Sequence, residues 1–163
     1  MANEYNNYGK EILGWLSDNQ ALPNATTVDS TNMVNIVGRT NGALWINVYA
    51  NTAIAIASGQ AFSIELQGFT ADTAVSATSP FSTGNKAGYV ATGGATSEPD
   101  AHYYLLHKTS GAALNFAAGD LITQCAIPED LFDALGYDYV QLVYVTDASE
   151  VSETVDAFVY AKL

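Results

Sequence analysis

The sequence predicts an all-β protein, an antiparallel jelly roll or β-sandwich of about eight strands. Short apolar runs recur between clusters of Gly, Asn, Ser and Thr beyond Pro23. The alternating strand and helix patterns that build a parallel sheet are missing. The last two runs, 138–146 and 154–161, are joined by the connector DASEVSE, which suits a hairpin in an antiparallel sheet.

Length and charge restrict the classes of protein that this chain can belong to. Its 163 residues suffice for one hydrophobic core. Acidic side chains number 17 against five basic ones, so the formal net charge is -12. Nucleic acid attracts stripes of lysine and arginine, and such a balance excludes a DNA- or RNA-binding protein.

Cysteine content and hydropathy set further bounds. Cys125 is the only cysteine, which rules out an intramolecular disulfide and a cysteine metal cluster. The start MANEYNNYGK has neither the basic nor the apolar region of a signal peptide, and no apolar run approaches the length of a membrane span. We expect a soluble chain made in a cytoplasm, without a membrane partner.

The first element predicted is a short amphipathic helix over Gly9–Asn19. Tyr8, Ile12, Trp15 and Leu16 follow a helical spacing, and Pro23 supplies a stop signal. We therefore divide the chain into an N-terminal arm with a short helix, residues 1–22, and a β-sandwich or jelly-roll domain, residues 23–163. The helix either packs on its own sheet or docks on a neighbouring subunit, and its stripe is a candidate subunit interface.

The predicted strands follow in order. They cover Val28–Val37, Ala43–Tyr49, Ala53–Ala57, Phe62–Gln67, Lys86–Ala91, His102–Lys108, Leu121–Ile127, Tyr139–Thr146 and Thr154–Tyr160. The residues from Gly68 to Ser97 are assigned to long connections between sheets, and Pro128–Phe132 to one helical turn.

Alternation within three runs predicts which side chains face inward. Phe62, Ile64 and Leu66 alternate with polar residues, which gives that strand one wet face. In the last run Val155, Ala157 and Val159 oppose Phe158 and Tyr160, so these aromatic rings are expected on the outer or partner-facing side. Trp45, Asn47 and Tyr49 likewise oppose Leu44, Ile46 and Val48, and core packing is expected for at least one of these two faces.

No constellation for catalysis or metal binding is evident. A G-x-S-x-G nucleophile string is absent, and the spacing of His102 and His107 places them on opposite faces of a regular strand. Acids such as Asp29, Glu65 and Asp120 are interpreted as solvated caps. We predict no catalytic residues, no cofactor and no metal.

Three segments carry a family resemblance. They are VDSTNMVNIVG (Val28–Gly38), ALWINVY (Ala43–Tyr49) and the ending from Ile127 to Leu163. They resemble the small jelly-roll cement, or decoration, proteins of tailed bacteriophage capsids. The resemblance implies a homotrimer on the outside of the virion that clamps neighbouring major capsid protein subunits together. No residue of a trimer-forming motif matches, so no functional residue is transferred.

The predicted function is therefore structural rather than enzymatic. An acidic chain is repelled by packaged DNA and suits the capsid exterior after synthesis in the host cytoplasm. The subunit is expected to bind the outer surface of the capsid and stabilise it. The alternative is a carbohydrate-binding or receptor-binding module that uses exposed Trp and Tyr rings, and a glycosidase is a third possibility.

Overall fold

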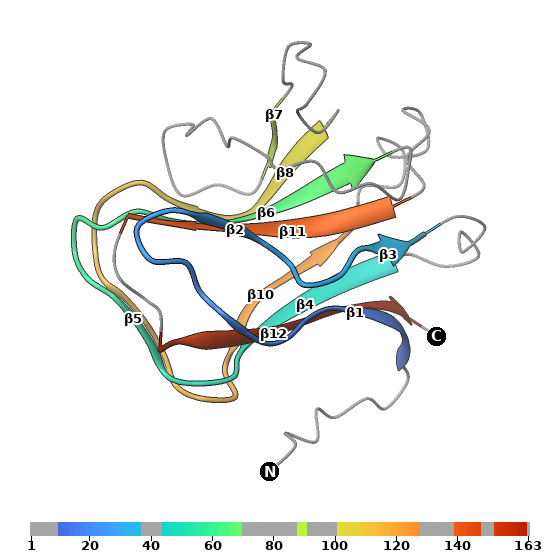
Figure 1. Cartoon of the computed structure of the whole chain (residues 1–163), viewed down its shortest axis with the longest axis horizontal. Helices are drawn as coiled ribbons and strands as arrows, with labels where there is room; N and C mark the ends of the chain where they lie inside the picture. Colours follow the sequence, from blue (N-terminus) through green and yellow to red (C-terminus); the bar gives the residue numbers. More distant parts are fainter. Residues whose placement is uncertain are drawn as a thin grey trace.

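The computed structural model describes residues 10–36, 44–69, 88–90, 101–127, 139–147 and 152–162. Over these residues every regular element is a β-strand, and all strand pairs are antiparallel. The prediction of an antiparallel all-β protein is confirmed at this level. Figure 1 shows the strands arranged in two layers.

The lower layer in Figure 1 is a four-stranded sheet in the order β1-β12-β4-β10. Its strands are β1 (Lys10–Ala21), β12 (Thr154–Lys162), β4 (Leu44–Ala50) and β10 (Leu121–Ala126). The first and last strands of the described chain therefore pair with each other.

The upper layer is a six-stranded sheet in the order β2-β11-β6-β8-β7, with β3 also paired to β11. Its strands are β2 (Thr27–Asp29), β3 (Val34–Asn35), β6 (Phe62–Phe69), β7 (Gly88–Val90), β8 (Ala101–Lys108) and β11 (Tyr139–Thr146). A small two-stranded sheet joins β5 (Ile54–Ile56) to β9 (Leu114–Phe116).

The predicted strands agree with this arrangement, with two differences. The run Val28–Val37 is divided into β2 and β3, and the short strand β9 was not predicted. Most of the connection from Gly68 to Ser97, and the helical turn predicted at Pro128–Phe132, lie outside the described residues.

The hydrophobic core lies between the two sheets, because alternate residues of each strand point toward the other layer. Burying each large aliphatic side chain stabilises the fold by about 1.5–3 kcal/mol. The buried members include Leu44, Ile46, Val48, Val155, Ala157 and Val159 from the four-stranded sheet and Ile64, Leu66, Val140, Leu142 and Tyr144 from the six-stranded sheet.

The inward residues of β4, β6 and β12 are those that the alternation predicted. The prediction that the other face of β6 is exposed to solvent is wrong. Ser63, Glu65 and Gln67 are fully buried. Val143 and Val145 of the neighbouring strand β11 are buried on the same side of the sheet. The outer face of the six-stranded sheet is therefore covered at these positions, which a single strand's alternation does not reveal.

The prediction of a helix over Gly9–Asn19 is wrong for the described residues, because Lys10–Ala21 forms strand β1. This strand pairs with β12 through three register shifts, at Ile12/Gly14, Trp15/Ser17 and Ser17/Gln20. Each shift inserts an extra residue, which is the definition of a β-bulge. Most of the predicted N-terminal arm is thus part of the four-stranded sheet.

Gly14 of β1 marks a close approach between the two sheets. A Cβ atom at this position would lie 2.9 Å from Cγ2 of Val34 in β3. Real Cβ atoms essentially never come so close to another heavy atom. Glycine therefore lets β3 pack directly against β1.

A chain of hydrogen bonds runs from one sheet to the other, and its Ser17–Tyr144 bond is buried. The hydroxyls of Ser17 in β1 and Tyr144 in β11 lie 2.8 Å apart. Ser17 also donates to Oε1 of Gln20 at 2.7 Å, so its single proton is used and Tyr144 is the donor of the first bond. Gln20 Oε1 in turn accepts the backbone N–H of Thr31 at 2.8 Å. The network fixes β1 relative to β11 and to the turn that follows β2.

Removing the phenolic hydroxyl with Tyr144→Phe should destabilise the fold by about 1–2 kcal/mol at neutral pH, because Ser17 loses its buried donor. Burial raises the pKa of Tyr144 well above its ordinary value. The unfolded chain ionises this group near pH 10, about its ordinary value, while the folded chain keeps it protonated. Wild type should therefore lose more stability than Tyr144→Phe above that pH.

Urea unfolding of both proteins at neutral and alkaline pH measures these differences. Tyr139→Phe, at the half-buried start of the same strand and outside this network, is the matched control. Equal stability of wild type and Tyr144→Phe at neutral pH, with the same alkaline slope, would contradict the network.

Candidate functional site

The outward side of the four-stranded sheet carries a group of aromatic rings. Trp15 comes from β1, Phe158 and Tyr160 from β12, and Trp45 and Tyr49 from β4. We call these five side chains the aromatic face. Strand alternation places them there, since Leu44, Ile46 and Val48 of β4 and Val155, Ala157 and Val159 of β12 belong to the core.

Phe158 lies at the centre of the aromatic face and is completely buried. The Trp15 ring meets it edge-on with centroids 5.1 Å apart, and the Tyr49 ring stacks on it at 6.0 Å. Tyr160 lies 6.0 Å away along the same strand. These separations are within the range preferred for aromatic pairs. The rings therefore hold one another in fixed orientations.

Polar side chains between the rings add a second set of restraints. Gln124 of β10 donates to Asn47 Oδ1 at 2.9 Å and to the Tyr160 hydroxyl at 2.7 Å. Asn47, which is buried, donates to the Tyr49 hydroxyl at 3.0 Å. Burial raises the pKa of Tyr160, while the bond from Gln124 opposes that change. The phenol of Tyr160 thus remains a neutral hydrogen-bonding group at physiological pH.

The edges of this sheet expose apolar surface. Trp15 on edge strand β1 is 37% exposed, and Leu121 on the opposite edge strand β10 is 43% exposed. Leu121 pairs directly with Tyr49, so it borders the aromatic face. These two are the exposed large hydrophobic residues of the described chain. By strand register both lie on one side of one sheet, at the two edges of the ring cluster.

The stripe proposed from the sequence as a subunit interface is divided by the structure. Ile12 is half-buried and pairs with Tyr160, and Trp15 is exposed. Leu16 is fully buried in the core, on the inner side of β1. Tyr8 lies outside the described residues. Ile12 and Trp15 therefore remain candidate contacts on the aromatic face, whereas Leu16 supports the fold.

The sequence indicated outward rings at Phe158 and Tyr160 but did not join them to Trp15. That connection depends on the pairing of β1 with β12, which a helical interpretation of β1 conceals. Leu121 was also missed, because its contribution follows from its position opposite Tyr49 on an edge strand.

The two histidines do not follow the regular alternation expected of them. Leu105 is an extra residue in β8, so Ile64 pairs with Leu106 and Glu65 with Tyr104. The bulge brings His107 opposite Ser63 and His102 opposite Gln67, positions of the same parity on β6. The register therefore contradicts the prediction that the two histidines lie on opposite faces of the strand. His107 is also buried, with its ring 4.2 Å from that of Tyr104.

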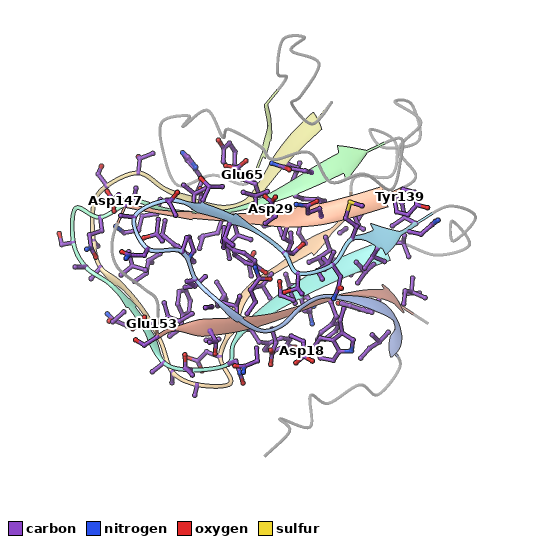
Figure 2. The ribbon with its side chains drawn as sticks, in the orientation of Figure 1. Asp18, Asp29, Glu65, Tyr139, Asp147 and Glu153 are labelled. Carbon is purple, nitrogen blue, oxygen red and sulfur yellow. The ribbon has the colours of Figure 1, made fainter. Side chains whose placement is uncertain are left out.

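The acidic residues have different environments. Asp120 accepts the backbone N–H of Ala117 at 2.7 Å and is an exposed turn cap, as predicted. Glu65 is fully buried, so its interpretation as a solvated cap is wrong. Asp29 and Glu65 both pair with Val143, one from each side of β11, and Figure 2 shows both on the upper sheet.

The described residues contain no group of three or more His, Cys, Asp or Glu side chains that could hold a metal ion. Within the same residues, no helix is long and apolar enough to cross a membrane. Comparison of the whole chain with protein-family models, curated proteins and solved structures finds no match.

Fluorescence can test the exposure difference between the two tryptophans of the chain. Trp45 is half-buried among the rings, whereas Trp15 is exposed at the sheet edge. Trp45→Phe leaves Trp15 as the sole emitter, and Trp15→Phe leaves Trp45. Acrylamide should quench the first variant more strongly. Equal quenching, or the reverse order, would contradict the outward position of Trp15.

Proposed function

We propose that the protein is a structural subunit that binds the outer surface of a bacteriophage capsid and stabilises it by bridging major capsid protein subunits. The observation that carries the proposal is the aromatic face with its two exposed apolar borders, Trp15 and Leu121. Interface cores are enriched in aromatic residues and depleted in charged ones. A rigid ring cluster loses little conformational entropy on binding, which favours it as an anchor.

The order of the strands supports a jelly-roll assignment within this proposal. When β3, β5, β7 and β9 are left out and the three-residue strand β2 is kept, the sheets read β1-β12-β4-β10 and β2-β11-β6-β8. This order is the one expected of two Greek keys wound into a jelly roll, in which the first and last strands are neighbours. Jelly rolls recur in viral capsid and lectin domains. This arrangement agrees with the resemblance to capsid decoration proteins.

Charge supports the outer surface of the shell as the location. The net charge of -12 gives the subunit an unfavourable interaction with packaged DNA. A homotrimer would present three copies of the exposed borders, Trp15 and Leu121, to adjacent capsid subunits. Simultaneous engagement of several weak contacts raises the overall affinity by about 10²–10⁴. Reinforcement therefore needs no catalytic chemistry.

Binding to empty shells tests this proposal directly. Shells assembled from the major capsid protein of the same genome should co-sediment with the wild-type protein and survive higher temperatures than bare shells. Trp15→Ala combined with Leu121→Ala should weaken binding about tenfold or more, because both apolar anchors are lost. The variant should keep its β-sheet circular dichroism, since both residues are exposed.

Asn115→Ala is the matched control, because Asn115 is exposed on β9, in the separate two-stranded sheet. It should bind shells as the wild type does. Wild-type protein that does not bind, or binds without any gain in heat tolerance, would overturn the proposed function. Full binding by the double variant would overturn the assignment of the aromatic face as the contact.

A further inference from the structure

Strand β10 forms one edge of the four-stranded sheet, beside β4 (Figure 1). Among the described residues no other strand pairs with it. Its six residues, LITQCA, include no charged residue and no proline. Its one register shift lies at its start, between Leu121 and Thr123. An edge strand of this kind can pair with a strand of another chain.

The other edges of the two large sheets carry the features that protect natural edge strands, namely bulges, charge and short length. Strand β1 has three register shifts and an exposed Asp18. Strands β2 and β7, at the two ends of the six-stranded sheet, are each three residues long. Of the four edges that the structure describes in these sheets, β10 is therefore the one best suited to pairing.

The backbone of β10 offers hydrogen-bonding groups along this edge. The N–H of Ile127 donates to the backbone oxygen of Leu44 at 2.7 Å. The preceding pair, Ala126 with Trp45, is therefore a non-hydrogen-bonded pair of the antiparallel ladder. The two kinds of pair alternate, so Gln124 has the same orientation as Ala126. The backbone N–H groups of Gln124 and Ala126 thus point away from β4, toward the open edge.

The edge is held in place before any partner arrives. On the inner side, the hydroxyl of Thr123 donates to the backbone oxygen of Leu105 in β8 at 3.1 Å. On the outer side, the Gln124 side chain donates to Asn47 and to Tyr160. These bonds fix β10 to both layers of the fold. Preorganisation of this kind reduces the entropic cost of binding.

Charge indicates where two copies of this acidic chain can approach each other. Each copy carries a formal net charge of -12, so most of its surface repels a second copy. Strand β10 and its neighbour β4, with the sequences LITQCA and LWINVYA, contain no charged residue. A contact between two β10 strands therefore places no carboxylate of these strands against another.

We propose that two copies of the chain pair through β10 in antiparallel orientation. The complement of an edge with outward N–H and C=O groups is an extended backbone, and a second β10 supplies one. Antiparallel pairing of identical strands has two-fold symmetry, so the contact closes with two copies. The bulged or short strands at the other edges oppose further extension of the sheets.

The pair would join two four-stranded sheets into one continuous sheet. Directly opposed residues of neighbouring strands point to the same face, so both aromatic faces would lie on one side of this sheet. Trp15 and Leu121 of each copy would then project from the same surface. The inference goes beyond the proposed function and does not depend on it, because pairing is measured on the chain alone.

The test is sedimentation velocity of the full chain from micromolar to millimolar concentration. The wild type should reach twice the single-chain mass of 17.2 kDa. Ala126→Pro removes the outward N–H without removing a bond to β4, and the two-fold symmetry doubles this loss. It should raise the dissociation constant of the pair about tenfold or more. Ala126→Ser, which keeps the N–H, is the matched control and should pair as the wild type does.

Amide hydrogen exchange of the wild type gives a second measurement, which does not require that the proline variant folds. The amides of Gln124 and Ala126 should exchange more slowly as the concentration rises. A wild-type chain that stays monomeric, or that forms the homotrimer implied by the resemblance, would overturn the inference. Unchanged pairing by a folded Ala126→Pro, or exchange of these two amides that does not depend on concentration, would overturn it too. None of these results alters the shell-binding test.

Discussion

The irregular pairing of β1 with β12 is the constraint on which the aromatic face and the hydrogen bonds between the two sheets depend. The last of its three register shifts allows Ser17 and Gln20, three residues apart, to pair with Ala157 and Val155, which both face the core. Ser17 therefore reaches Tyr144 of the opposite sheet, and Gln20 reaches the turn after β2. A regular strand would place one of these two polar side chains on the outer face.

The same strand contributes side chains to both sides of the four-stranded sheet. On its outer side it supplies Trp15, which packs against Phe158 and completes the aromatic face. On its inner side Gln20 bonds to the backbone of Asp29, at the end of β2, and to that of Thr31. The proposed shell contact and the bonds that join the two sheets thus share one strand. A substitution of Trp15 can leave these bonds intact, because separate side chains form them.

Strand positions could be predicted from the sequence wherever alternation is regular, as in β4, β6 and β12. The prediction failed where the strand has bulges. In β1 the inserted residues give Ile12, Trp15 and Leu16 a helix-like spacing, although Trp15 and Leu16 face opposite sides. The outward positions of Phe158 and Tyr160 were predicted from the same alternation. The position of Asp29 beside β11 was not, because it depends on the long-range pairing of β2 with β11.

The register of β1 is therefore the central claim, and backbone NMR measures it most directly. Cross-strand nuclear Overhauser effects should connect Trp15 to Phe158, Ser17 to Ala157 and Gln20 to Val155. Sequential amide–amide contacts typical of a helix over residues 10–19 would contradict this register. Cross-strand contacts that continue along β12 without the three register shifts would contradict it as well.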